Sequence, residues 1–404
     1  MTVEQHRIST APQGAKHASP LQQTIPPAHQ EAPQQSASPA AFAVVALLRD
    51  PQALARAHDV ELMDNHLYVP GKGGMLAVID VTAPDRPEIV WSAHLGEDAQ
   101  TVLCRNGHAF VGSRDVHAVD IAEPAAARVC KRLRDRPRID LINGMISWGR
   151  HILYANKAGW IGMVDVSEPT EPVLVGAVDA RHAGGLLSPH DIAAYRDCIV
   201  VVDQRDGSPF KVRLYRVAAS PTGEALAPDR WQTAGAVGGA ALNGANRVAI
   251  YGDYALVGCN KAQTLGVVDI RDPERPETVQ VLPFPGEPCG LVVAGAVLFA
   301  AGGRTIQALD LTDPTDPQVL ATVESQQAFP AAFDKTGTGA TRLTTVDGRS
   351  IASTGNAHDL VYADGYLYVT AQSDHQVAIL RVENPHIRKL AAQPPVRFGG
   401  ACIP

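Results

Sequence analysis

A unit of three short strands repeats seven times along this 404-residue chain. Each copy has a strand, a tight turn and a second strand, as in GRHILYA, GDYALVG and ADGYLYV, followed by a third strand. Five third strands lead through an Asp to a proline exit, LAVIDVTAP, VHAVDIAEP, IGMVDVSEP, LGVVDIRDP and IQALDLTDP, whereas VRLYRVAASP and VAILRVENP lack the Asp. A repeat of this length and texture is typical of radial repetition around an axis. The sequence therefore predicts an all-β fold, a seven-bladed β-propeller with four-stranded antiparallel blades.

The segments after the prolines complete the predicted blades. EIVWSAHL, VLVGAVD, TVQVLPF and QVLATVE have the apolar content of fourth strands. Either AFAVVALL before the first unit or HIRKLAAQ after the last one is expected to close the ring. An Asp side chain bonds the backbone that follows it in a turn, so we expect turn caps at the repeat aspartates, Asp80, Asp120, Asp165, Asp269 and Asp310.

The repeats resemble a known family. VIDVTAPDRP, MVDVSEPTEP, VVDIRDPERP and ALDLTDPTDP, each preceded by a YV-type strand, are similar to the repeats of LVIVD-repeat propellers. The resemblance extends over about residues 43–395. It implies a seven-bladed scaffold, and it implies no particular activity, because a fold does not carry a chemistry with it.

Composition limits the domains and the partners. Residues 1–40 are rich in Gln, Pro and Ala, which predicts a disordered tail before a propeller at residues 41–404. The net charge is -7 and the basic residues are scattered, so we expect no nucleic-acid partner. Neither a signal peptide nor an apolar run of membrane-spanning length is found, which predicts a cytoplasmic protein with no membrane partner. Six cysteines without a C-x-x-C pair are expected to be reduced thiols.

The first strand of each blade lines the channel of a propeller, so the residues that start these strands face one another. Aligning the units places these blade starts at His58, Gln100, Asn143, His190, Asn246, Cys289 and His358. Three starts are His-Asp dipeptides. Neutral imidazoles are common ligands of divalent transition metals. We therefore predict His58, His190 and His358 as catalytic ligands of Zn, Mn or Fe, with Gln100, Asn143, Asn246 and Cys289 around them. The alternative is that each His-Asp dipeptide ties its blade to neighbouring loops.

A basic residue also recurs in the loop between the second and third strands. Six blades carry one, at Lys72, Arg114, Lys157, Arg205, Lys261 and Arg304, and the seventh has His375. These loops are expected to open on the same face as the blade starts, where a ring of cations would attract a small anionic molecule. We predict the six basic residues as substrate-binding groups. The alternative is that they are ordinary polar turn residues in solvent.

The interval between Cys289 and His358 is longer than the others. Its extra residues fall between the last two blades and form a candidate lid with Phe329, Phe333 and Arg342. A floppy decoration is the alternative. Cys289 beside His358 is a less favoured candidate nucleophile.

Two hypotheses about function follow. The first is a metal-dependent lyase or isomerase that acts on a small, carboxylate-bearing substrate at the channel mouth. An oxidoreductase that uses iron or copper is a less favoured variant. The second is a non-catalytic interaction scaffold that binds a protein partner or an anionic ligand. Bound metal that depends on His58 or His358 would favour the enzyme.

Overall fold

The computed structural model describes residues 41–219, 225, 227–324, 342–344, 350–352 and 357–395. The predicted tail, and Phe329 and Phe333 of the predicted lid, lie outside the described residues. Arg342 begins a short strand, β26 (Arg342–Thr344), which pairs with β27 (Ser350–Ala352). All the elements below belong to the compact unit that begins at Pro39.

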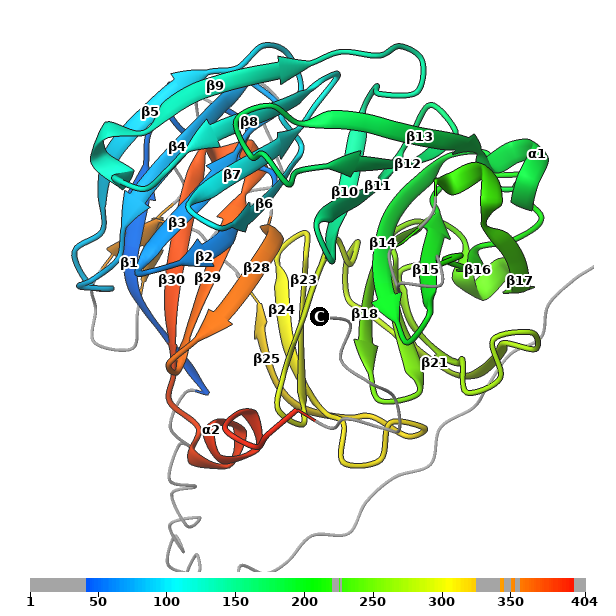
Figure 1. The fold of residues 1–404 in the computed structure, drawn as a ribbon. Helices are drawn as coiled ribbons and strands as arrows, with labels where there is room; N and C mark the ends of the chain where they lie inside the picture. The colour runs from blue at the N-terminus through cyan, green and yellow to red at the C-terminus, as the bar shows by residue number, and fades with distance from the viewer. Residues whose placement is uncertain are drawn as a thin grey trace, which may run out of the picture. The chain divides into compact units, whose positions relative to one another are not determined.

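Seven four-stranded antiparallel sheets form the blades of a propeller in the described residues (Figure 1). Blade 1 has β2 (Glu61–Met63), β3 (His66–Pro70), β4 (Met75–Asp80) and β5 (Glu88–His94); blade 2 has β6 (Thr101–Arg105), β7 (His108–Gly112), β8 (Val116–Asp120) and β9 (Arg128–Leu133). Blade 3 has β10 (Ile142–Trp148), β11 (His151–Asn156), β12 (Trp160–Asp165) and β13 (Val173–Asp179); blade 4 has β14 (Pro189–Tyr195), β15 (Cys198–Asp203), β16 (Val212–Arg216) and β17 (Gln232–Val237). The predicted fold class is confirmed.

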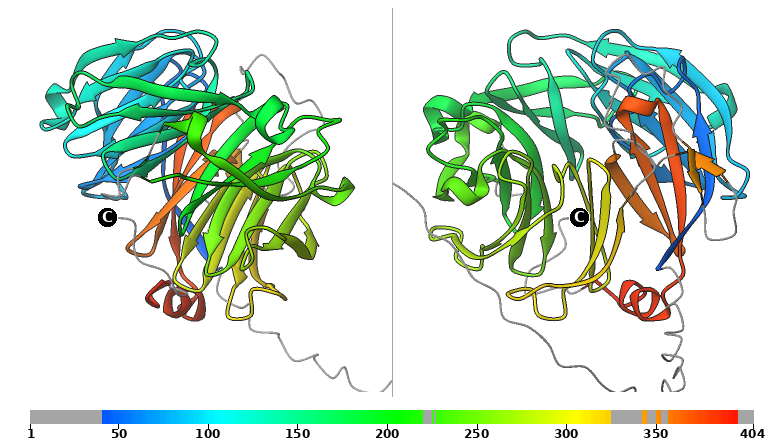
Figure 2. Two further views of the ribbon diagram at one scale, coloured as in Figure 1. Left: turned by 45° about the vertical axis from the view of Figure 1, so that its right-hand side comes forward. Right: turned by 180° about the vertical axis from the view of Figure 1, so that it is seen from behind.

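The remaining blades close the ring (Figure 2). Blade 5 has β18 (Ala245–Tyr251), β19 (Tyr254–Cys259), β20 (Thr264–Asp269) and β21 (Glu277–Pro283); blade 6 has β22 (Gly290–Ala294), β23 (Val297–Gly302), β24 (Thr305–Asp310) and β25 (Gln318–Glu324). Blade 7 has β28 (Ala357–Ala363), β29 (Tyr366–Ala371) and β30 (Gln376–Val382), and its outer strand is β1 (Phe42–Arg49). The first expectation for ring closure, AFAVVALL, is therefore confirmed. HIRKLAAQ instead starts within a helix, α2 (Pro385–Ala391), which Asn384 caps at its N-terminus.

The core is divided among the interfaces between blades. One cluster of buried apolar residues lies between each pair of neighbouring blades, including blades 7 and 1. The second and third strands supply most of it because both of their faces are covered, as in Val200–Val202 of β15. Each blade therefore buries its apolar surface only when its neighbours are present, and ring closure stabilises all seven.

The repeat aspartates act as predicted. In each of the five repeats that carry one, an Oδ1 atom accepts a hydrogen bond from the backbone N–H two residues later, at Thr82, Ala122, Ser167, Arg271 and Thr312. The N···O distances are 2.7 to 3.1 Å. These turns set the angle at which the chain passes from the third strand to the outer strand.

Two further findings bear on the composition. No helix in the described part of the chain is long and apolar enough to cross a membrane. The cysteines in that part are free thiols, two of them buried and three partly buried. Cys402 lies outside the described residues.

Candidate functional site

The seven predicted blade starts lie at the beginning of the inner strands, around one end of the channel. We call these residues the channel mouth: His58, Gln100, Asn143, His190, Asn246, Cys289 and His358. Five of them are buried, whereas Cys289 and His358 are partly buried. The rings of His58 and His358, from blades that meet at the ring closure, have centroids 3.9 Å apart.

Each channel-mouth histidine bonds the next blade. The Nδ1–H groups of His58, His190 and His358 donate to the backbone carbonyls of Gln100, Asn246 and His58, respectively, at 2.6 to 2.8 Å. A carbonyl oxygen only accepts, so Nδ1 carries the proton and Nε2 keeps a free lone pair. The histidines therefore connect blades 1 to 2, 4 to 5 and 7 to 1.

The aspartates of the same dipeptides also connect blades. Asp59 accepts from the backbone N–H of Val102 in blade 2, and Asp191 accepts from that of Val248 in blade 5, both at 3.0 Å. The alternative interpretation of the His-Asp dipeptide, a tie to a neighbouring blade, therefore describes contacts that are present. The free Nε2 atoms leave a ligand role open to the histidines.

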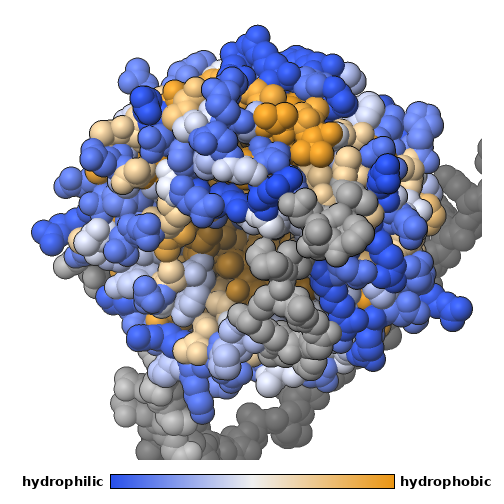
Figure 3. Space-filling view, viewed as in Figure 1, coloured by the Kyte–Doolittle hydropathy of each residue, from blue (hydrophilic) through white to orange (hydrophobic). Residues whose placement is uncertain are grey.

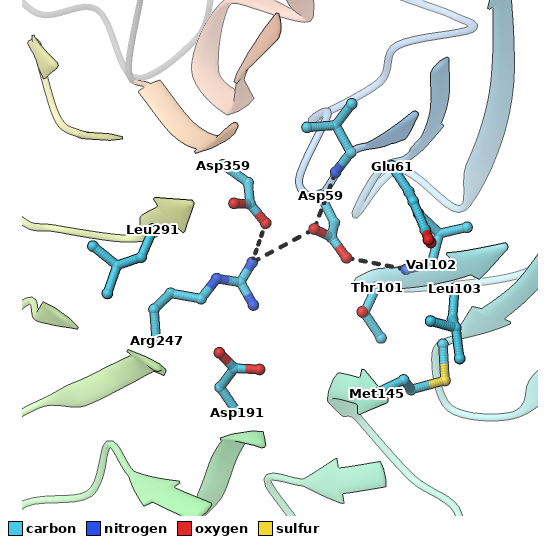
Figure 4. Close-up of a pocket in the computed structure, with 11 residues that line it drawn as sticks. Asp59, Glu61, Thr101, Val102, Leu103, Met145, Asp191, Arg247, Leu291 and Asp359 are labelled. Atoms are coloured by element: carbon cyan, nitrogen blue, oxygen red, sulfur yellow. Dashed lines mark hydrogen bonds and ion pairs between the residues drawn. The ribbon is translucent and has the colours of Figure 1, made fainter. Parts of the chain in front are cut away.

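Arg247, next to the channel-mouth residue Asn246, is at the centre of a network of charged side chains (Figure 4). Its Nη2 lies 2.7 Å from Asp359 Oδ2 and 3.9 Å from Asp59 Oδ1. Its Nε donates to the Cys289 carbonyl at 2.7 Å, and its Nη1 donates to the Asn143 carbonyl at 3.4 Å. One guanidinium thus joins blade 5 to blades 1, 3, 6 and 7.

We call Asp59, Asp191, Arg247 and Asp359 the charged layer. Burial alone would lower the pKa of the guanidinium, but the three surrounding carboxylates raise it above its ordinary value, so the group stays charged. Burial raises the pKa of Asp191 and that of Asp359, which the neighbouring Asp59 raises further. The layer is a buried ion cluster held by its single cation.

Arg247 is not among the site residues predicted from the sequence, although a signal for it is present. Arg247 follows Asn246, so it occupies the position that Asp59, Asp191 and Asp359 occupy in their own blades. A lone cation aligned with three acids could have predicted an ion cluster across the channel. The aligned glycines have a matching role, since a Cβ atom on Gly290 would lie 2.7 Å from the Cα atom of Asp359.

The channel-mouth histidines are neutral. Burial is the largest cause that lowers the pKa of His58, His190 and His358 well below 6.5. Lys72, Lys157 and Arg247 contribute to this shift at all three histidines, and so all three cations lie within electrostatic reach of the mouth.

Lys72 and Lys157 extend toward the mouth from blades 1 and 3. Burial lowers the pKa of Lys72 to about 8, and burial together with Lys72 lowers that of Lys157 to about 7. Lys157 Nζ donates to Gln100 Oε1 at 3.5 Å. Within the described residues, no carboxylate forms an ion pair with either ammonium group.

The other predicted basic residues have different surroundings. Arg114 forms ion pairs with Glu97, Asp98 and Asp140, and Lys261 pairs with Asp206. Arg205 and Arg304 have exposed side chains. His375 accepts from the backbone N–H of Arg56. The structure thus brings two of the six predicted anion-binding residues into electrostatic reach of the channel mouth.

Some polar atoms at the mouth have no partner. Both side-chain polar atoms of Asn143 and the Oδ1 atom of Asn246 are buried without a hydrogen bond to any described residue. Unpaired buried amides are costly, which points to a bound molecule or ion at the mouth. Burial raises the pKa of Cys289, so its thiol stays protonated, unlike an activated nucleophile.

A cavity of about 240 Å³ extends along the inner strands and includes the charged layer. Its other walls include Glu61, Met145 and Leu291 (Figure 4). Burial raises the pKa of Glu61 to about 8, although it accepts from the backbone N–H of Cys104 at 2.6 Å. The face of the propeller in Figure 3 is hollowed near its middle, with apolar residues in the hollow.

The three channel-mouth histidines do not gather their ligand atoms at one point. In the described part of the chain, three or more potential metal-ligating side chains converge within 4.8 Å at His108, Asp120 and Cys130. That cluster lies on β7, β8 and β9 of blade 2. The predicted metal at the channel mouth stays a prediction.

Comparisons with known proteins agree with the fold and the repeats. With the seven blades closed by β1, the chain is a β-propeller. The LVIVD repeat family matches residues 55–93, 156–180 and 244–280, which lie in blades 1, 3 and 5. The chain is thus a seven-bladed propeller that carries LVIVD repeats.

One solved structure gives a further comparison. The computationally designed Ika8 protein, in its crystal packing No.1 in P63, is 13% identical with a TM-score of 0.53. The match covers 81% of this chain and 96% of the designed one, and at that identity it shows the fold alone. No curated protein shows significant sequence similarity to this chain.

Proposed function

We propose that the channel mouth binds a small carboxylate. The observation that carries this proposal is the pair of lysines, Lys72 and Lys157, which are partly buried and form no ion pair with a carboxylate in the described residues, Asp98 acting on both only over a longer distance. A buried ammonium group without a counter-ion is unfavourable. An anion that enters the mouth supplies the missing charge, and the bound state raises the pKa of both lysines.

Neighbouring groups add selectivity. The unpartnered Nδ2 of Asn143 is a further donor for the anion. The neutral histidines hold their protons on Nδ1, so each Nε2 can accept a hydrogen bond and cannot donate one to a carboxylate. In a ligand with a hydroxyl beside its carboxylate, the carboxylate accepts hydrogen bonds from donors such as Asn143 Nδ2, and the hydroxyl donates one to a histidine Nε2.

Calorimetric titration tests the site with succinate and malate, which differ by one hydroxyl. Malate binds more tightly than succinate, and Lys157→Met weakens the binding of both by roughly tenfold or more because a charge-assisted hydrogen bond is lost. Lys261→Met, on an exposed pair with Asp206, is the matched control and leaves affinity unchanged. Equal binding by wild type and Lys157→Met contradicts the proposal.

Binding also depends on pH in a stated direction. The anion binds the protonated lysines, whose free-state pKa values are about 7 for Lys157 and about 8 for Lys72. Affinity is therefore greatest below pH 7 and falls as the pH rises through these values. An affinity independent of pH between 6 and 9 would remove the lysines from the site.

A metal-dependent enzyme is the second candidate function. The observation that favours it is the free Nε2 lone pair on each of His58, His190 and His358. A metal held there would polarise an oxygen of a carboxylate substrate, as in a lyase or isomerase, and a non-ligating histidine would move a proton. The fit is partial, because the three ligand atoms do not converge in the described structure.

Elemental analysis of untagged protein decides between the two candidates. About one metal per chain, lost in folded His58→Ala, His190→Ala and His358→Ala variants, supports the enzyme. Metal that the three histidine variants retain, or protein without stoichiometric metal when expressed with ample Zn, Mn and Fe, contradicts it and leaves the carboxylate-binding site as the function of the mouth.

A further inference from the structure

A cluster of three potential metal ligands lies at the end of blade 2 opposite the channel mouth: His108, Asp120 and Cys130. His108 begins β7, Asp120 ends β8 and Cys130 lies in β9, so three neighbouring strands supply one residue each. His108 and Asp120 are directly paired in the sheet. One ligand atom from each of the three residues lies within 4.8 Å of the others, and all three residues are partly buried.

Each side chain has a ligand atom to offer. The Nδ1–H of His108 donates to the Asn106 carbonyl at 3.0 Å. Its Nε2 is buried and has no hydrogen-bond partner among the described residues. Asp120 uses Oδ1 for its turn, which leaves Oδ2 with Arg128 Nη2 at 3.7 Å. The Cys130 thiol makes only a weak contact of 3.5 Å with the Arg128 carbonyl.

The other blades show what is particular to blade 2. The same His–Asp pair recurs as His66–Asp80 in blade 1 and His151–Asp165 in blade 3, so the pair alone is a feature of the repeat. Cys130 is the extra residue of a β-bulge, because the register shifts between Ala118 and Val119. A bulge re-aims its side chain.

The same bulge position is apolar in four other blades, where it carries Val90, Val175, Val279 and Leu320. Blade 2 thus carries a thiol in place of an aliphatic side chain at the bulge that lies beside His108. The exchange adds a potential metal ligand at this position.

We propose that His108, Asp120 and Cys130 bind a zinc ion. Imidazole, carboxylate and thiolate are the ligand types that Zn²⁺ prefers, and tetrahedral geometry places such ligand atoms about 3.5 Å apart. The three ligand atoms already lie within 4.8 Å of one another, so only small side-chain rotations would be needed to bring them to that spacing. Three protein ligands leave a fourth position for water, and the Asn106 carbonyl orients the imidazole. The site is independent of the carboxylate proposed at the channel mouth.

Cobalt substitution tests the site, because a thiolate bound to Co²⁺ gives a charge-transfer absorption that other ligands lack. Reduced, untagged full-length protein is titrated with Co²⁺ and then with Zn²⁺. Wild type develops the thiolate band, and Zn²⁺ abolishes it by displacement. Cys130→Val, which installs the residue found in blades 1, 3 and 5, folds normally and lacks the band.

Two further variants complete the test. His108→Gln weakens Zn²⁺ binding at least tenfold, as expected when a protein ligand is removed. Cys289→Ser changes the partly buried thiol at the channel mouth and keeps the band. The proposal is overturned if wild type shows no thiolate band or if Cys130→Val retains it; a band that Cys289→Ser removes assigns the ion to the channel.

Discussion

Two sets of aspartates in this propeller differ in what they hold together. The five turn aspartates, such as Asp269, are partly exposed and bond the backbone two residues away. Of the three aspartates of the charged layer, Asp59 and Asp359 are buried and Asp191 is partly buried, and each contacts Arg247 or a neighbouring blade. The first set shapes single blades, whereas the second joins blades across the ring.

Burial determines the energetic difference between the sets. A hydrogen bond in an exposed turn replaces one to water, so its net contribution is small. A carboxylate inside the channel has lost its water and depends on its partner. The comparison therefore predicts that substitutions in the charged layer cost much more stability than substitutions in the turns.

The largest effect is expected from Arg247→Met. It leaves the buried Asp59 and Asp359, and the partly buried Asp191 beside them, without their cation, which costs about 3–5 kcal/mol of unfolding free energy. Urea denaturation followed by circular dichroism measures the loss. Arg271→Met, which removes an exposed arginine paired with Asp253 and Asp269, is the control and costs less than about 1 kcal/mol. Equal costs for the two variants would contradict the comparison.

The substitution Gly290→Ala tests the same comparison by adding one methyl group beside the charged layer. The new Cβ atom would lie 2.7 Å from the Asp359 Cα atom, so the backbone must shift, at a cost of about 1–3 kcal/mol. Gly176→Ala in an outer strand meets its nearest atom at 3.4 Å and is the control. Thermal unfolding of both variants gives the difference, and a neutral Gly290→Ala would show that the layer is loosely packed.

The pH dependence of the unfolding free energy is expected to reflect the buried histidines of the channel mouth. Burial lowers the pKa of His190 well below 6.5, so the unfolded chain takes up a proton before the folded one does. The stability that His190 contributes is complete above about pH 7 and is lost, by about 1.4 kcal/mol per pH unit, as the pH falls below 6.5.

The measurement compares wild type with His190→Gln in urea at pH 5, 6 and 7. Glu61 and Asp191, whose pKa values are raised, oppose the histidine term in both proteins and cancel in the difference. The stability of wild type relative to the variant therefore declines toward pH 5. A constant difference between the two proteins would mean that His190 ionises in the folded state as it does in water.

The smallest effect is expected from the turns. Asp269→Ala removes one exposed hydrogen bond to the Arg271 N–H, at a cost of about 0.5–1 kcal/mol. Thermal unfolding measures the loss. A cost as large as that of Arg247→Met would abolish the distinction between the two sets of aspartates.

The features that recur from blade to blade could be predicted from the sequence. The seven blades, the turn aspartates and the positions of the channel mouth follow from patterns that recur every 40 residues or so, because each blade solves the same local problem. The closing strand β1 was one of two alternatives, since both termini carry apolar segments. The second alternative forms α2, in which Pro385 and the Asn384 cap start a helix.

Features that depart from the repeat in a single blade were harder to predict. Arg247 departs from the repeat at an aligned position, and its role depends on which side chains meet across the channel. Arg114 differs from Lys72 and Lys157 because it forms ion pairs with nearby carboxylates, whereas Asp98 acts on the two lysines only over a longer distance; no repeat encodes this neighbourhood. Cys130 stands out only in the folded structure, where a bulge in β9 brings it close to His108.

The pKa of Lys157 tests the central claim most directly. A nuclear magnetic resonance titration of selectively ¹³C-labelled lysine, assigned with the Lys157→Met variant, follows the side chain with and without malate. The account predicts a midpoint near 7 in the free protein and a clear rise when malate binds. A midpoint near the ordinary lysine value of about 10.4, unchanged by malate, would contradict a carboxylate site at the channel mouth.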